Sequence, residues 1–326
     1  MEKQRNSNLD IVRGLAVIFV VFIHIRFPGK LGTIGSDLGG LCNALFFLIS
    51  GYFVLNNTRK KIVYKALRSF ALVIISYLFY ATIYQDSVAT IVCGLPDILI
   101  GNVNRCGNLW FAVALVYCYI LYYFLGDTNI KYMLILLVIV ETLYSTYCPY
   151  VYRPIWATAF YGVPLFFLGN YLAQKKLGGG YNKLFICGII FGVLLSFSNL
   201  ADGLVPARLN MLGTVIYAFS VFMWAIFVPE ISYKNVIFRI ISLIGRKHYV
   251  YFYVFQYITI SIVKACIYIL VFKIYDVFGI EISFVDYVIP LGVVAALYIE
   301  SLLLNNIWSL LKMYLNKAKI WKNMSG

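Results

Sequence analysis

Apolar residues dominate the chain in runs of about twenty, and short polar clusters separate one run from the next. A run of that length forms a helix that crosses the hydrocarbon core of a bilayer. The pattern therefore predicts an all-α bundle of ten membrane-spanning helices, in a single domain over residues 1–326 without a soluble domain. The predicted spans are residues 8–25, 39–56, 63–84, 107–126, 130–147, 155–174, 183–198, 209–228, 249–272 and 284–311. The longest connection, residues 85–106, carries apolar turns of its own and is a candidate re-entrant or interfacial segment.

Composition supports a membrane protein, because 62% of the residues are hydrophobic and only 12% are charged, against about 25% in soluble domains. The net charge of +14 would suit nucleic-acid binding in a soluble protein. In a membrane protein it follows from the excess of Lys and Arg in cytoplasmic loops. With the N-terminus inside, nineteen of the 27 Lys and Arg residues fall on the cytoplasmic side and six on the outer side. This bias predicts ten spans with both termini cytoplasmic, in the cell membrane, among lipids rather than nucleic acid.

The seven cysteines show no CxxC spacing, and most lie in apolar runs where a small buried side chain is expected. Cys93 and Cys106 share one connection and are a candidate disulfide. No cluster of His, Cys and carboxylate residues has the spacing of metal ligands, so the sequence predicts no metal site.

Few ionisable groups remain inside the bilayer, where a charged group is costly and by default indicates function. They are Asp10, Arg13, His24, Glu141, Lys264 and Glu300. Lys264 and Glu300 lie at comparable depths in the last two spans, and we interpret them as a structural pair that neutralises itself.

Arg13 and His24 are eleven positions apart, which places them on one helix face and roughly 16 Å apart along its axis. Asp10, three residues before Arg13, can pair with it on that face. Glu141 lies at a depth similar to that of His24 and could orient or charge the imidazole, or pair with a cation elsewhere. The simpler alternative is that Arg13 reaches lipid phosphates and His24 caps the helix in the outer interface.

The second span ends in ALFFLISGYFV, residues 44–54. Ser50 and Tyr52 are its polar groups, and Gly51 between them permits close approach of another helix. The basic stretch RKKIVYKALR, residues 59–68, follows on the cytoplasmic side. Its cations suit either anionic lipid or a phosphate-bearing cofactor.

The fourth span opens with GNLWFAVALVYCY, residues 107–119. Asn108 and Trp110 lie at its outer boundary, where aromatic residues are also expected as interface anchors.

The segment LDIVRGLAVIFVVFIH, residues 9–24, resembles the opening of membrane acyltransferase family 3, with its LDxxRxxA and Arg-x10-His patterns. Four later segments resemble that family's FFxxSGY, LWF, FFxxG and GxxSxxxYxxH segments. They are ALFFLISGYFV, NLWFAVALVYCY, VPLFFLGNYLA (residues 163–173) and IGRKHYVYFYVFQ (residues 244–256). Two departures stand out. An aspartate common before the FF of the second span is replaced by the Cys42-Asn43-Ala44 segment, and the last histidine of the late segment is Gln256.

The resemblance implies transfer of an acyl group, usually acetyl, from cytoplasmic acyl-CoA to a hydroxyl or amine of an envelope polysaccharide or lipid-linked sugar. Acetyl-CoA would be a co-substrate, and His24 would be the general base, with Glu141 beside it. The CoA phosphates would be held by a cationic set made of Arg13, with Asp10 beside it, and Arg59, Lys60, Lys61 and Arg68. The acceptor site would be shaped by Ser50, Tyr52, Asn108 and Trp110.

The acceptor itself is not encoded in any motif, and we expect its specificity in the outer connections 26–38, 85–106 and 199–208. Two alternatives stay open. One is a transporter or flippase for a small polar solute or a sugar lipid, although the chain shows no obvious inverted repeat. The other is an inactive relative that serves as a partner in an assembly.

Overall fold

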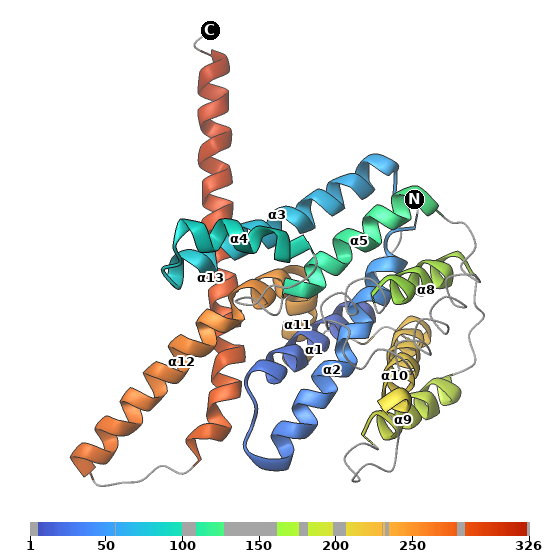
Figure 1. The fold of residues 1–326 in the computed structure, drawn as a ribbon, viewed down its shortest axis with the longest axis horizontal. Coiled ribbons are helices and arrows are strands. Elements are labelled where there is room, and N and C mark those ends of the chain that lie inside the picture. Colours follow the sequence, from blue (N-terminus) through green and yellow to red (C-terminus); the bar gives the residue numbers. More distant parts are fainter. Residues whose placement is uncertain are drawn as a thin grey trace.

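The computed structural model describes residues 6–55, 57–99, 109–126, 162–175, 182–197, 207–229, 231, 235–278 and 284–324. Its helices, in chain order, are α1 (Ser7–His24), α2 (Gly29–Tyr52), α3 (Arg59–Ile83), α4 (Val88–Leu99), α5 (Trp110–Leu125), α8 (Val163–Gln174), α9 (Asn182–Phe197), α10 (Ala207–Phe227), α11 (Val236–Leu243), a π-helical turn (Ile244–His248), α12 (Tyr249–Phe278) and α13 (Val285–Met324) (Figure 1). The described residues form no strand, which confirms the all-α prediction.

Five helical segments are long and apolar enough to cross a membrane: α1, α2, α3, the continuous run Val236–Val277, and Val285–Tyr314 of α13. The molecule is therefore a multi-pass membrane protein by the length and composition of its helices. The predicted fifth span, residues 130–147, lies outside the described residues, as does the first part of the sixth. The remaining predicted spans each coincide with a helix, several of them shorter than 18 residues.

Residues 29–38 were expected in an outer connection, and that expectation is wrong, because α2 begins at Gly29 directly after Pro28. The segment's glycines make it look like a loop in the sequence, but here they let backbones touch. A methyl group on Gly32 would clash with the carbonyl oxygen of Phe27, and one on Gly39 with that of Phe19. Phe19 belongs to α1, so Gly39 lets two helices approach closely, as small residues do in membranes.

The connection 85–106 contains the 12-residue helix α4, which is too short to span a bilayer. Its carbonyl at Ile91 accepts a hydrogen bond from the Tyr77 hydroxyl of α3 at 3.3 Å. Most of its side chains are exposed. These features fit the expected re-entrant or interfacial segment.

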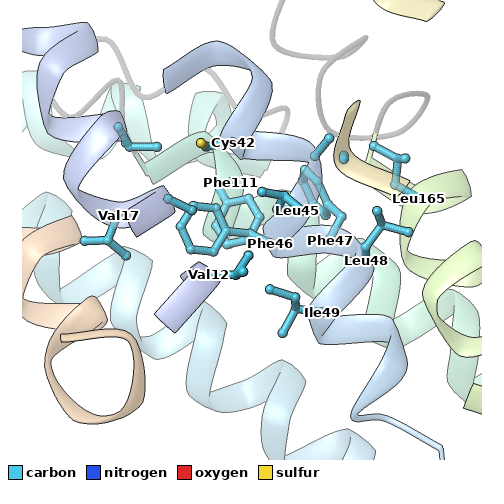
Figure 2. Packing of buried hydrophobic residues seen from close by; sticks show 14 of the residues in the cluster. Val12, Val17, Cys42, Leu45, Phe46, Phe47, Leu48, Ile49, Phe111 and Leu165 are labelled. Carbon is cyan, nitrogen blue, oxygen red and sulfur yellow. The ribbon is translucent and has the colours of Figure 1, made fainter. Parts of the chain in front are cut away.

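The second helix forms the centre of the bundle, with side chains from 44 to 49 no more than 4% exposed. Figure 2 shows these residues surrounded by Val12 and Val17 of α1, Phe111 of α5 and Leu165 of α8. A helix that is apolar on every side is one that the molecule encloses.

The glycines of two family-like segments join α2 to α8. A methyl group on Gly51 would clash with the carbonyl oxygen of Phe166, and one on Gly169 with that of Leu48. The two backbones therefore touch at reciprocal positions, which confirms the packing role expected for Gly51. Because Gly51 faces α8, its neighbours Ser50 and Tyr52 face elsewhere.

The start of α1 is fixed by two asparagines. Asn6 caps the helix by accepting hydrogen bonds from the N–H groups of residues 8 and 9. Buried Asn8 donates to the carbonyls of Ala225, Val228 and Pro229 and accepts from the N–H of Ile231 at 2.9 Å. These bonds join α1 to the end of α10, and they help to fix the position of the following turns of α1, which include Arg13.

Candidate active site

A cavity of about 770 Å³ opens between α1, the end of α2, α3, α5 and the start of α12. Its size is that of a small-molecule or cofactor site. The polar residues lining it are Asn6, Arg13, Ser50, Tyr52, Lys65, Arg68, Ser69, Tyr119, Tyr249 and Tyr253.

Arg13 enters this cavity from α1, at the level where α1 packs on the π-helical turn. A side chain on Gly245 of that turn would clash with the carbonyl oxygen of Asp10, so the two backbones touch there. The guanidinium lies 5.7 Å from the ring centroid of Phe53 and 5.4 Å from that of Tyr249. Two aromatic rings from different parts of the chain thus hold the cation by cation–π contacts.

Two more cations enter the cavity from α3. The ammonium group of Lys65 lies 5.9 Å from the ring centroid of Tyr119 and within electrostatic range of Arg13, and Arg68 follows one turn later. No carboxylate is present among the described residues of the lining. A concave, largely apolar site with three converging cations has a positive potential and suits an anion such as a phosphate.

Ser50 and Tyr52 reach the same cavity from the end of α2. The Tyr52 ring is fixed by an edge contact with Phe222 of α10, at a centroid distance of 5.3 Å. These groups supply the cavity with hydroxyls beside its cations.

His24 does not line this cavity; it lies at the far end of α1, where its ring is half-buried. Its Nδ1 is 3.0 Å from the hydroxyl oxygen of Tyr257, and the two rings meet edge to face at 5.0 Å. The imidazole thus bonds to α12 rather than capping α1.

One face of α12 connects the two ends of α1. Tyr249, Tyr253 and Tyr257 recur every four residues and so share that face. Tyr249 contacts Arg13, Tyr253 lines the cavity and Tyr257 bonds His24. The tyrosine face, as we call these three residues, leads from the cationic cavity to the imidazole.

The other predicted phosphate ligands lie outside the cavity. Arg59, Lys60 and Lys61 are exposed at the start of α3, and the Arg59 guanidinium lies 5.7 Å from the ring centroid of Tyr123. Asp10 is buried, one turn before Arg13. Trp110 packs on Phe47 at a centroid distance of 6.1 Å and does not line the cavity.

Glu141 and Asn108 lie outside the described residues, so the roles predicted for them stay predictions. Cys93 of α4 is a free, exposed cysteine, which contradicts the candidate disulfide with Cys106. The predicted Lys264–Glu300 pair is not formed between these two described residues. Glu300 instead accepts a hydrogen bond from the Thr259 hydroxyl at 2.7 Å, and Lys264 is exposed.

Sequence reasoning did not single out Lys65 or the tyrosine face. Helical periodicity contained the signal for both. Lys65 and Arg68 are one turn apart on α3 and both line the cavity, whereas the adjacent cations at the start of the basic stretch do not. The four-residue spacing of the tyrosines was obscured by the many other aromatic residues around them.

Comparison with known proteins adds one finding. The model of acyltransferase family 3, described as an acyltransferase domain, matches residues 6–304, which include every element of the cavity and His24. No curated protein and no solved structure matches the chain.

Proposed function

The chain belongs to membrane acyltransferase family 3, and from that premise we propose that it moves an acetyl group from cytoplasmic acetyl-CoA to a hydroxyl of a cell-envelope carbohydrate. The proposal includes ten spans with both termini cytoplasmic, all of them in one catalytic domain. The observation that carries it is the cationic cavity beside Arg13 and its connection to His24 along the tyrosine face.

The phosphates of CoA would occupy the cavity. Arg13, Lys65 and Arg68 line it, and guanidinium groups make paired hydrogen bonds to phosphate oxygens. Arg59, Lys60 and Lys61 lie at the start of the same helix, where they would raise the local concentration of the anionic donor. They would act by long-range attraction rather than as contact residues.

The thin pantetheine arm would then follow the tyrosine face, so that the thioester reaches the imidazole. His24 would take the proton of the acceptor hydroxyl while the acceptor oxygen attacks the thioester carbonyl. The carbon–sulfur bond breaks as the ester forms, and the proton passes from the imidazolium to the CoA thiolate. If the imidazole attacks the thioester itself, a transient acyl-imidazole precedes the ester.

Glu141 would stand beside His24 and orient or charge it, and Asn108 and Trp110 would contact the acceptor at the outer boundary. Ser50 and Tyr52, which line the cavity, are better placed to contact the donor than the acceptor. We therefore propose that these two residues contact CoA and not the acceptor carbohydrate.

The test is transfer of label from acetyl-labelled acetyl-CoA to envelope glycans, in membranes that carry the wild type or His24→Ala. We expect label with the wild type and none with the variant, at equal amounts of folded protein. Label with both proteins would support the acetyltransferase activity but show that His24 is not its general base. Solute uptake or lipid flipping without acetyl-CoA, and no label with either protein, would favour a transporter or flippase instead.

A further inference from the structure

We propose that Tyr257 is the positioning residue of His24: its hydroxyl oxygen accepts a hydrogen bond from Nδ1–H and so leaves Nε2 as the basic nitrogen. The inference rests on the proposed role of His24 as general base. It also predicts which tautomer His24 adopts, and the tautomer can be measured without an enzymatic assay.

The geometry of the pair is that of a held imidazole. Nδ1 and the Tyr257 oxygen are 3.0 Å apart, and the rings meet edge to face at 5.0 Å. A neutral imidazole carries one N–H and one bare nitrogen, and the partner of one nitrogen decides which form is present. Among the described residues this is the ring's one hydrogen bond.

Chemistry selects the direction of the bond. A general base needs a lone pair on the nitrogen that faces the substrate. If Tyr257 donated to Nδ1, the proton would reside on Nε2 and the ring could not accept another there. If Tyr257 accepts from Nδ1–H, Nε2 is free to take the acceptor's proton, and the imidazolium that forms keeps the same bond.

Tyr257 is itself fixed in place. Its ring meets the ring of Tyr80 edge to face at 6.4 Å. Tyr80 is fully buried, and its hydroxyl donates to the carbonyl of Val254 at 2.6 Å, which ties α3 to α12 one turn before Tyr257. The Ser261 hydroxyl donates to the backbone carbonyl of Tyr257 at 3.0 Å. A partner held this way restricts the imidazole to one orientation.

The first experiment is ¹⁵N NMR of the full-length protein labelled at its two histidines, with the signals of His24 assigned by their loss in His24→Gln. We expect neutral His24 to be protonated at Nδ1 in the wild type and to be a mixture of tautomers in Tyr257→Phe. Protonation at Nε2 in the wild type, or an unchanged tautomer in the variant, would overturn the inference whatever the protein's activity.

The second experiment is the kinetics of Tyr257→Phe. We expect kcat to fall about tenfold, with a KM for acetyl-CoA within about twofold of the wild type. Because the hydroxyl also stabilises the imidazolium when it accepts, the acidic limb of the pH–rate profile should move to lower pH in the variant. A move to higher pH would mean that Tyr257 donates.

Tyr268→Phe is the matched control, since it removes a hydrogen-bonded tyrosine hydroxyl from the same helix without touching His24 or Tyr257; that hydroxyl donates to Asp286 at 2.8 Å. It should leave the pH profile in place. Both variants leave three further ionisable groups near the pair unchanged: Arg26 two residues beyond His24, Asp37 of α2, which interacts with Arg26, and Tyr253, which interacts with Tyr257. If His24→Ala abolishes transfer and Tyr257→Phe behaves like the control, only the positioning role fails. If His24→Ala retains transfer, the proposed base itself fails.

Discussion

At the residue scale, the cations of this protein divide into two groups by what they touch. Arg13 and Lys65 line the cavity and lie over aromatic rings, whereas Lys60 is exposed and outside it. An ionic hydrogen bond to a phosphate contributes about 1.5–3 kcal/mol, which corresponds to roughly a tenfold to hundredfold change in binding.

Arg13→Gln should therefore raise the KM for acetyl-CoA by at least about tenfold, and Lys65→Gln by a smaller factor because a lysine makes a single point contact. The measurement is initial-rate kinetics in purified, reconstituted protein. Lys60→Gln makes the same chemical change outside the cavity and should alter KM less than about twofold at physiological salt. Equal effects in all three variants would mean that the cavity does not hold the donor.

Sequence reasoning at this scale singled out Arg13, Arg68, Ser50 and Tyr52, which line the cavity, because each is a polar or charged group within or directly beside an apolar run. It could not rank the cations of residues 59–68, because which of them turn inward depends on how α3 is rotated against α5. It missed Tyr257 for a similar reason. A tyrosine among aromatic residues carries no signal until α1 is placed beside α12.

At the element scale, glycines that permit backbone contact decide how helices meet. Gly51→Ala should place a methyl group against the carbonyl oxygen of Phe166 and push α2 away from α8. Overpacking of this kind costs about 1–3 kcal/mol, so we expect a lower melting temperature in detergent and a lower yield of monodisperse protein. The control is Gly40→Ala in the same helix, where no atom lies within 4 Å of the added methyl group. That change should be neutral or slightly stabilising, because alanine favours the helix.

Asn8 provides a second test at this scale, because it joins α1 to α10 through one side chain. Asn8→Ala would remove the Asn8 partner from the partly buried N–H of Ile231 and from the carbonyl of Val228. An unsatisfied buried group costs about 1–3 kcal/mol. A thermal-unfolding series should show Asn8→Ala well below the wild type. Asn57→Ala, which removes an exposed bond to the carbonyl of Phe53, should stay close to it. A stable Asn8→Ala protein would show that other contacts position α1.

The start of α2 shows where element-scale sequence reasoning fails. Residues 29–38 have low hydropathy and include Gly29, Gly32 and Gly35, so a rule based on apolar runs begins the span at residue 39. The helix nevertheless starts at Gly29, and Gly35 and Gly39 pack against α1. Hydropathy measures the affinity of a segment for lipid. A helix face that packs on another helix does not contact lipid, so it can be polar or glycine-rich and still be helical.

At the scale of the whole molecule, the excess of Lys and Arg and the opening of the cavity lie on the same predicted side of the membrane. The basic start of α3 is on the predicted cytoplasmic side, and Lys65 and Arg68 line the cavity within the first three turns of that helix. The class of protein was predictable because composition and charge bias are sums over the whole chain. The cavity was not, since it is assembled from helices that are distant in sequence.

The proposed orientation predicts that the donor enters from the cytoplasm. Inverted membrane vesicles, which expose the cytoplasmic face, should label an enclosed glycan acceptor when acetyl-CoA is added outside, because the membrane-impermeant donor reaches Arg13 directly. Right-side-out vesicles should show little label until a detergent permeabilises them, and permeabilisation should bring both preparations to the same rate. Arg13→Gln should lower the rate in inverted vesicles by raising KM, without changing which preparation is active. Full activity of intact right-side-out vesicles would reverse the predicted orientation of α3 and, with it, the cytoplasmic placement of both termini.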